Sequence, residues 1–377
     1  MPLRDSRFLE SDNWPDSPQA DLARRILPDY VHRGPAQFVA NADVTMRLWR
    51  VGDQVVPVAY RERPQGGWTT DVCSPWSHYV RYPLHEMKRR GGGLRTVPRR
   101  FLLQASGLFL RFSDIENVVF VNNWLLSTNP AVHLDDREIQ RMTATLSEEF
   151  PERAILLRTI NPTTDRELAA RLSHNGYRLV ASRTVHVLDP FSRAYRRSEN
   201  ARVDRRLLHD GRYEQIGHEE LTADDMPRVA ELHRLLYTEK HTALNAAYTS
   251  LFFETAWRNR FLEFQALRQD GRIEGFVAWY ELDGVVTPSL MGYDTRRPQE
   301  LGLFRRGMAL QTEHARSRGL PLNWSAGAGA FKHHRGGQPS IEYDAVFDRH
   351  LPRHRRIGWQ LLKAAGWFQQ RKVQRGW

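Results

Sequence analysis

The sequence is poor in cysteine, since Cys73 is the only one among 377 residues. A single thiol excludes an internal disulfide framework and is typical of a chain kept in a reducing compartment, so we expect a cytoplasmic protein. No base partner is apparent around Cys73, which favours a small packing residue over a catalytic nucleophile.

Long apolar runs are also lacking. No run approaches the ~20 residues that a membrane-spanning helix needs, so we expect no integral membrane segment. Residues 1–5 do not show the charged-then-apolar order of a signal peptide. The basic, glycine-rich stretch 88–95 lacks the spacing of a P-loop or a dinucleotide fingerprint. His333 and His334 are adjacent and have no accompanying ligand set, so we expect neither a metal nor a cofactor.

What the chain does contain is positive charge. Its formal charge is +11 and its pI is near 10.0, while an apolar content of 41% is that of a globular protein. This charge indicates an anionic partner: nucleic acid, a membrane surface or a phosphorylated substrate. Charge alone does not choose among the three. The length suffices for two or three domains.

The first half of the chain mixes strand and helix patterns. Residues 1–39 are interpreted as an N-terminal arm, and residues 40–190 as a first domain with a hairpin, a buried strand at 118–126 and a helix over 135–150. Asn122, Asn123 and Ser127 lie where that buried strand ends. They could line a cleft, or serve as turn and capping residues.

A basic segment then connects this half to a second one. We predict one connecting helix over 191–212, whose cations are nucleic-acid-binding candidates: Arg193, Arg196, Arg197, Arg202, Arg205 and Arg206. Residues 213–348 repeat the order of helix, antiparallel strands, helix, strand and final strand. The sequence therefore predicts an α+β protein of two tandem α/β-layered domains, with mixed central sheets flanked by helices.

The tail, residues 349–377, is basic and carries an apolar stripe. It is predicted to be a helix that docks on a phosphate backbone or on an acidic membrane surface. The alternative is a solvated helix that closes the domain. Its nucleic-acid-binding candidates are Arg353, Arg355 and Arg356.

A stretch at residues 322–337 carries the chemistry. A short apolar run gives way to small residues, followed by Phe331, Lys332 and Arg335, and the chain turns on Gly336 and Gly337. Small residues let a ligand approach the backbone, and cations at such a turn suit anionic oxygens. A glycine-rich hairpin with solvated cations is the alternative.

Several short motifs in this half resemble a known family: Gly292-Tyr293-Asp294, Gly302-Leu303-Phe304-Arg305, Arg318-Gly319-Leu320 and Phe331-Lys332. They are similar to the acyl-CoA N-acyltransferase (GNAT) superfamily, and specifically to its tandem branch with Fem-type aminoacyl-tRNA transferases. The resemblance covers about residues 40–350. It implies two GNAT domains with the active cleft in the second, and a catalytic role for Phe331 and Lys332, where the lysine stabilises negative charge on the substrate.

One departure from the superfamily pattern concerns coenzyme A. Users of acyl-CoA carry an Arg/Gln-x-x-Gly-x-Gly/Ala loop that binds pyrophosphate, and residues 296–302 do not give it. We therefore expect aminoacyl-tRNA as donor and a small-molecule amine, hydroxylamine or hydroxyl as acceptor, in natural-product or cell-wall-type biosynthesis. Transfer from acyl-CoA or an acyl carrier protein, and RNA binding without catalysis, are the alternatives.

The remaining site residues were chosen by residue type and position. Asp294 is predicted as a general base or amine anchor, or else as a turn cap. Glu342 and Asp344 share a strand face, so they hold the acceptor amine or form a salt bridge. Arg335 suits a phosphate or carboxylate. The other predicted substrate-binding residues are Tyr293, Ser325, Lys240, His241 and Asn245.

Overall fold

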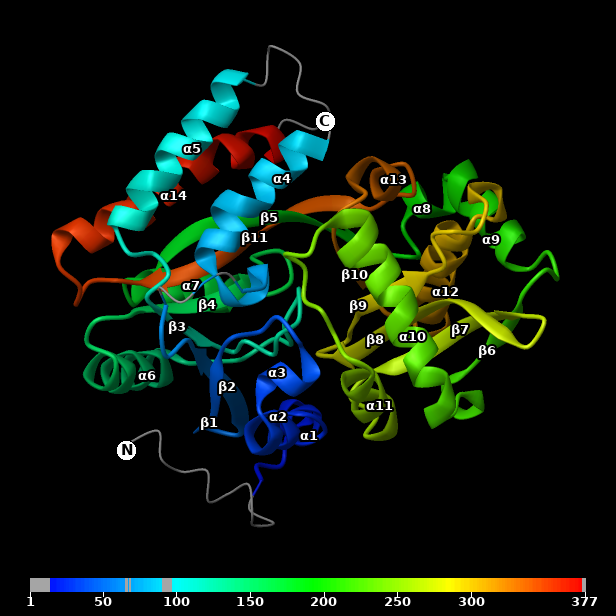
Figure 1. Cartoon of the computed structure of the whole chain (residues 1–377), viewed down its shortest axis with the longest axis horizontal. Coiled ribbons are helices and arrows are strands. Elements are labelled where there is room, and N and C mark those ends of the chain that lie inside the picture. The colour runs from blue at the N-terminus through cyan, green and yellow to red at the C-terminus, as the bar shows by residue number, and fades with distance from the viewer. Residues whose placement is uncertain (1–13, 65–66, 68, 90–96, 375–377) are drawn as a thin grey trace.

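The computed structural model describes residues 14–64, 67, 69–89 and 97–374. In this part of the chain, eleven strands form one sheet with the order β1-β2-β3-β4-β11-β5-β10-β9-β8-β7-β6 (Figure 1). The strands are β1 (Thr45–Val51), β2 (Gln54–Tyr60), β3 (Val118–Val121), β4 (Ala154–Ile160), β5 (Arg178–Leu188), β6 (Glu214–Ile216), β7 (Glu263–Gln269), β8 (Arg272–Leu282), β9 (Val285–Tyr293), β10 (Leu322–Ala326) and β11 (Gln338–Phe347).

Helices cover both faces of this sheet. The first half contains α1 (Pro18–Arg24), α2 (Leu27–Arg33), α3 (Pro35–Phe38), the π-helical turn η3 (Ser77–Arg81), α4 (Tyr82–Arg89), α5 (Val97–Phe112), α6 (Asp136–Glu149) and α7 (Arg166–His174). The rest are α8 (Arg193–Arg197), α9 (Glu199–Leu208), α10 (Met226–His233), the π-helical turn η7 (Arg234–His241), α11 (Ser250–Arg258), α12 (Leu303–Arg318), α13 (Gly329–His333) and α14 (Arg353–Gln374).

Alternating side chains divide the core between the two faces. On β3, Phe120 packs with helices α1, α10 and α11 on one face, while Val119 packs with α6 and α7 on the other. On β8, Phe276 belongs to the first face and Val277 packs with α9 and α12 on the second. This period of two is what a sheet buried on both sides requires.

The chain contains two halves with the same local topology. In each, a strand runs parallel to the strand that follows the next helix: β3 to β4 across α6, and β9 to β10 across α12. A short helix and a long strand follow, α7 with β5 and α13 with β11. The α+β class and the two GNAT-like halves predicted from the sequence are thus present.

The two long strands are exchanged between the halves. β11 lies between β4 and β5, antiparallel to both, and β5 pairs in turn with β10. The sheet therefore does not part at the predicted boundary near residues 191–212. The predicted domain limits stay predictions, and residues 1–13, part of the stretch 88–95 and residues 375–377 lie outside the described residues.

Two local expectations are corrected. The predicted connecting helix is broken at Ser198, whose side chain caps α9 by accepting from the backbone N–H of Ala201. The predicted glycine-rich turn holds the short helix α13, which starts after Ala328 in the left-handed region, at φ 49°. A side-chain cap sets the start of α9, whereas a left-handed backbone residue precedes α13, and a composition pattern reveals neither.

Candidate functional site

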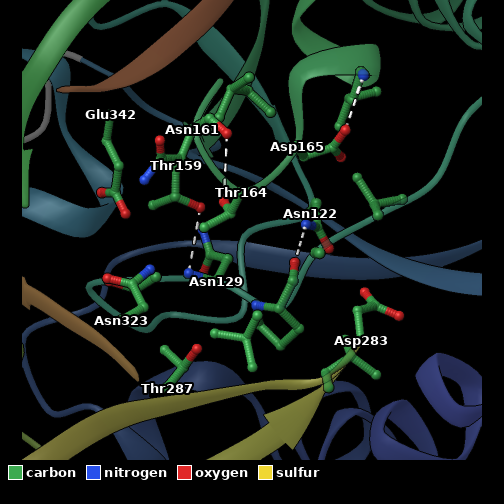
Figure 2. Close-up of a pocket in the computed structure, with 18 of the residues that line it drawn as sticks. Asn122, Asn129, Thr159, Asn161, Thr164, Asp165, Asp283, Thr287, Asn323 and Glu342 are labelled. Atoms are coloured by element: carbon green, nitrogen blue, oxygen red, sulfur yellow. Dashed lines mark hydrogen bonds between the residues drawn. The ribbon is translucent and has the colours of Figure 1, made fainter. Parts of the chain in front are cut away.

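A polar cavity of about 100 Å³ lies where the two halves meet. Its wall contains the ends of β3 and β4, the start of α7, part of the β8–β9 hairpin, and single residues of β10 and β11 (Figure 2). Most of these residues belong to the first half. A space of this size has room for several waters, at roughly 10–15 Å³ each, and so for a small polar molecule.

Strained backbone shapes the floor of the cavity. Asn122, just after β3, has φ 58°, and Thr159 near the end of β4 has φ 62°. Residues other than glycine rarely adopt a positive φ, and they keep it only where the surrounding structure holds them in place. Asn122 donates from Nδ2 to the carbonyl of Pro130 at 2.7 Å, and Thr159 Oγ1 accepts from the N–H of Asn129 at 3.3 Å. The loop after β3 is thereby fixed against the end of β4.

Four buried polar atoms on this wall have no hydrogen-bond partner among the described residues: Asn129 Nδ2, Asn161 Nδ2, Asp165 Oδ2 and Glu342 Oε1. Leaving such a group unpaired costs about 1–3 kcal/mol, so their gathering in one cavity is a mark of a binding site. Two of these atoms are amide donors and two are carboxylate acceptors. The cavity therefore suits a ligand with both a cationic and a carbonyl end.

The same four side chains are held rigid by their other atoms. Asp165 Oδ1 accepts from the N–H of Leu168 at 2.9 Å and so caps α7. Asn161 Oδ1 accepts from Ser340 Oγ at 2.8 Å, and Asn129 Oδ1 accepts from the N–H of Trp124 at 3.1 Å. These bonds fix the side chains in one position on the wall, as a pre-organised site requires.

Glu342 is the predicted site residue that the structure places on this wall. It is 1% exposed, and its Oε2 accepts from Arg183 Nε at 2.6 Å. Arg183 also donates to Thr128 Oγ1 at 2.7 Å, and Thr128 lies 3.0 Å from the hydroxyl of Ser325. Thr128 itself lines the cavity, so Ser325 lies within hydrogen-bond distance of the wall. Asp344 lies elsewhere, where its Oδ2 accepts from Tyr79 Oη at 2.7 Å.

Lys332 is buried but does not line the cavity. Its ammonium donates to the backbone carbonyls of Trp324, Ser325 and Ala326 at 2.6, 3.1 and 2.8 Å. Burial, with the charge of Arg183 as a smaller cause, lowers the pKa of Lys332 to about 7. All three donors of the ammonium close the end of β10, which leaves none for a substrate.

Phe331 and Arg335 pack toward the connecting helices. The Arg335 guanidinium lies over the Phe331 ring at 3.4 Å and forms a buried ion pair with Asp204 of α9, which also accepts from Arg305 at 2.6 Å. Phe331 also meets Phe304 edge to face. Arg335 therefore has an internal partner in place of the predicted phosphate or carboxylate.

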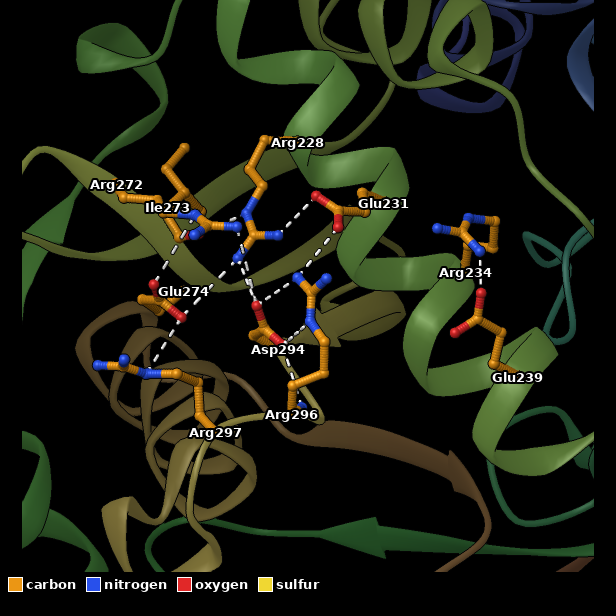
Figure 3. Close-up of polar contacts among 10 residues, drawn as sticks. All are labelled: Arg228, Glu231, Arg234, Glu239, Arg272, Ile273, Glu274, Asp294, Arg296 and Arg297. Atoms are coloured by element: carbon orange, nitrogen blue, oxygen red, sulfur yellow. Dashed lines mark hydrogen bonds and ion pairs between the residues drawn. The ribbon is translucent and has the colours of Figure 1, made fainter.

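Asp294 belongs to a different cluster, of arginines and carboxylates (Figure 3). It accepts from Arg228 at 3.0 Å and from Arg296 at 2.8 and 2.6 Å. The bonds from Arg296, followed by those from Arg228, hold the pKa of Asp294 well below its usual range, so this carboxylate is a poor proton acceptor. The structure keeps Asp294 out of the cavity.

The other predicted substrate-binding residues gather around η7. Lys240 donates to Tyr293 Oη at 3.0 Å, and Asn245 donates to the carbonyl of Tyr237 at 2.8 Å. His241 lies 6.1 Å from the Tyr237 ring, and burial lowers its pKa. None of these side chains lines the cavity.

The predicted nucleic-acid-binding arginines fall into two groups. Arg202 and Arg206 pair with Glu199, Arg205 pairs with Glu313, and Arg355 pairs with Asp114. The others have no acidic partner among the described residues; these are Arg193, Arg196 and Arg197 on α8, and Arg353 and Arg356 on α14.

Neighbouring side chains crowd one of the two helix starts that follow the parallel strands β3 and β9, and acidic side chains occupy the other. A Cβ on Gly302, before α12, would lie 2.6 Å from Leu207 of α9. The start of α6 carries Asp135 and Glu138 in a capping box, with Asp136 beside them, and these acids oppose an anion.

Sequence reasoning missed most of the cavity. Asn129, Asn161 and Asp165 each follow an apolar run, and only Asn122, Asn123 and Ser127 were noticed there. The signal that could have found them is amide and carboxylate side chains just past two neighbouring buried strands. Among the described residues, no group of His, Cys, Asp and Glu could hold a metal ion.

Two halves of the same topology within one mixed sheet define a protein of the tandem GNAT fold class. More particularly, the chain is similar to the C-terminal domain (DUF2156) of a putative lysylphosphatidylglycerol synthetase from Agrobacterium fabrum. The TM-score is 0.51 at 13% identity, with 93% of this chain and 92% of that chain covered.

Weaker similarities were also found. FemX gives a TM-score of 0.49 at 8% identity, covering 85% of this chain and 90% of that one. A tandem GNAT protein from the clavulanic acid biosynthesis pathway gives 0.41 at 11%, covering 92% and 97%. No protein-family model and no curated protein sequence matches the chain. In the described part of the chain, no helix has the length and apolar character to cross a membrane.

Proposed function

We propose that the protein is an aminoacyltransferase, which moves an amino acid from aminoacyl-tRNA to an amine, hydroxylamine or hydroxyl of a small-molecule acceptor in natural-product or cell-wall-type biosynthesis. The observation that carries this proposal is the cavity with two partnerless amide donors and two partnerless carboxylate oxygens. An aminoacyl ester has the matching groups, an α-ammonium and a carbonyl.

The chemistry asks little of the protein beyond alignment. The acceptor nitrogen or oxygen forms a bond to the acyl carbon, the ester C–O bond breaks, and the ribose hydroxyl takes up the proton that the acceptor loses. Because the ester is already activated, placing the reactants and stabilising the carbonyl oxygen supply most of the rate. We assign the ammonium to Asp165 and Glu342, and the carbonyl oxygen to the amides of Asn129 and Asn161.

The donor's phosphates need exposed cations without acidic partners. The exposed Arg193, Arg196 and Arg197 of α8 stand beside α13, because Ser198 Oγ donates to the carbonyl of His334 at 2.8 Å. Three unpaired guanidiniums suit an RNA backbone. We place the acceptor end of the tRNA there.

Coenzyme A fits this chain less well than tRNA does. The pyrophosphate position at the start of α12 is covered by Leu207, and the equivalent position at α6 is acidic. Both arguments come from the geometry and are independent of the missing loop motif.

The test is to incubate the protein with total charged tRNA, in which each amino acid is labelled in turn, together with a mixture of small amines. We expect one amino acid to leave its tRNA, and RNase treatment to abolish the transfer. Glu342→Gln keeps the shape of the side chain but removes its charge, and should lower turnover about 100-fold or more.

The matched control is Asp294→Asn, which neutralises another buried carboxylate away from the cavity. We expect it to turn over within about threefold of wild type. Equal losses in both variants would mean that the cavity is not the active site. Transfer from acyl-CoA that survives RNase would overturn the tRNA assignment.

A further inference from the structure

Helix α5 exposes an unusual amount of apolar surface. Phe101, Leu108 and Phe112 are each 71% exposed, and at 100° per residue they fall within about 40° of one another on the helix. The opposite side of α5 is packed, since Gly107 meets Trp76 and Val80 of the body, and Leu110 is buried. The exposed stripe is therefore the side of α5 that does not pack on the rest of the protein.

Helix α14 continues this surface. Ile357 and Leu361 are 42% and 47% exposed, one turn apart. The ring of His354 lies 6.3 Å from that of Phe112, and a Cβ on Gly358 would meet Ser113, so the two helices lie side by side there (Figure 1). Five large exposed apolar side chains thus come from two neighbouring helices, and we call the surface that carries them the α5–α14 face.

Cations border the α5–α14 face. Arg353, one turn before Ile357, is exposed on α14, whereas Arg356 and Lys363 line, together with Arg349, an open groove of about 920 Å³ on the side of this helix away from α5. None of these four has an acidic partner among the described residues. On the α5 side, Arg111 lies exposed beside Phe112, over the Trp76 ring.

We propose that the α5–α14 face docks on an anionic lipid bilayer. Exposed aromatic and aliphatic side chains with a basic border are what a helix lying in a membrane interface requires: the apolar stripe enters the headgroup region and the cations meet lipid phosphates. RNA would use the cations but would leave the apolar stripe in water. A second copy of this chain would bring like charges together.

Vesicle co-sedimentation tests this docking. The full chain is mixed with vesicles of phosphatidylcholine alone, or of phosphatidylcholine with about one third phosphatidylglycerol. We expect binding to the anionic vesicles that weakens as salt is raised. The variant Leu108→Ser/Phe112→Ser should bind about tenfold more weakly or worse, and so should Arg111→Glu/Arg353→Glu.

The control is Phe191→Ser, which removes another exposed aromatic, 49% exposed, outside α5 and α14. It should bind like wild type. Because the apolar double variant leaves the packed side of α5 intact, circular dichroism should show it folded; if it does not, Leu108→Ser alone and the charge variant carry the test.

Three results would overturn the proposal. The first is no binding to anionic vesicles at low salt, and the second is unchanged binding in a folded apolar variant. The third is a concentration-dependent dimer in analytical ultracentrifugation that dissociates in that variant, since the face would then join two copies. Loss of transferase activity in Glu342→Gln does not bear on this surface, so the two proposals fail separately.

Discussion

The two halves share a strand-helix-strand-helix-strand order but treat the end of their parallel strand differently. In the first half, β4 ends at a cavity with unpartnered amides and carboxylates. In the second half, β10 ends at three carbonyls that the Lys332 ammonium occupies. Each strand end holds a residue in the left-handed region, Thr159 at φ 62° and Ser325 at φ 57°. The same topology is thus left open once and sealed once.

The helix after each strand explains the difference. α7 is nine residues long and is capped by Asp165, whose Oδ1 accepts from the helix, while its Oδ2 has no partner among the described residues. α13 is five residues long and starts without a side-chain cap, so Lys332 can fold back onto the strand. The cavity is therefore open beside the first half and absent at the end of β10, and Glu342 reaches its wall from the second half on β11.

The largest expected effect concerns the ion pair between Asp204 of α9 and Arg335 in the second half. Asp204→Ala leaves the buried guanidinium of Arg335 without its partner, and breaking a buried pair costs about 3–5 kcal/mol. Urea unfolding should show this loss. Glu199→Ala on the same helix removes exposed pairs and should change stability by less than about 1 kcal/mol.

A pH effect is expected at the seam between the halves. His186 on β5 is 2% exposed, and burial, with Lys332 and His333 as smaller causes, lowers its pKa to about 4. Unfolding restores a pKa near 6.5, so the unfolded chain binds the proton first as the pH falls. Stability present above pH 6.5 is therefore lost toward pH 4, by roughly 3 kcal/mol at 1.36 kcal/mol per unit.

Unfolding curves of wild type and His186→Leu across this range check the effect. The variant should show a flatter dependence on pH. Equal slopes in the two proteins would place the proton uptake elsewhere.

A smaller effect distinguishes a structural role of Lys332 from a catalytic one. Lys332→Met keeps the length of the side chain but removes the donors to three strand-end carbonyls, which should cost about 2 kcal/mol of stability. Turnover of the folded variant should stay within about threefold of wild type. A 100-fold loss of turnover with an unchanged melting temperature would restore the catalytic role that the family resemblance implies for this lysine.

The smallest effect tests the strained start of the sealed helix. Ala328 is exposed with φ 49°, so Ala328→Gly should stabilise the protein by about 0.5 kcal/mol, because glycine adopts this conformation without strain. Ala330→Gly, inside α13, should instead destabilise it by about 0.5–1 kcal/mol. Melting temperatures that move in the same direction for both would contradict the strain argument.

Local patterns in the sequence predicted the elements of the open half closely. The expected helix over 135–150 is α6 at Asp136–Glu149, and the expected buried strand at 118–126 contains β3 at Val118–Val121. Apolar spacing and caps suffice for such elements.

The site was harder to predict because its residues meet only through long-range pairing. Glu342 reaches the wall because β11 inserts beside β4, and Arg335 forms an ion pair with Asp204, far away in the chain. No local spacing encodes either event. Glu342 was found through residue type and position on its strand, whereas Asn129, Asn161 and Asp165 required the fold.

The exchange of β5 and β11 has a consequence for how the chain folds during synthesis. The gap between β4 and β5 stays unfilled until Gln338–Phe347 has left the ribosome, when most of the polypeptide already exists. Pairings between such distant segments form slowly. A nascent chain that stops before this strand would expose unpaired strand edges on both sides of the gap. Such edges bind chaperones or lead to aggregation.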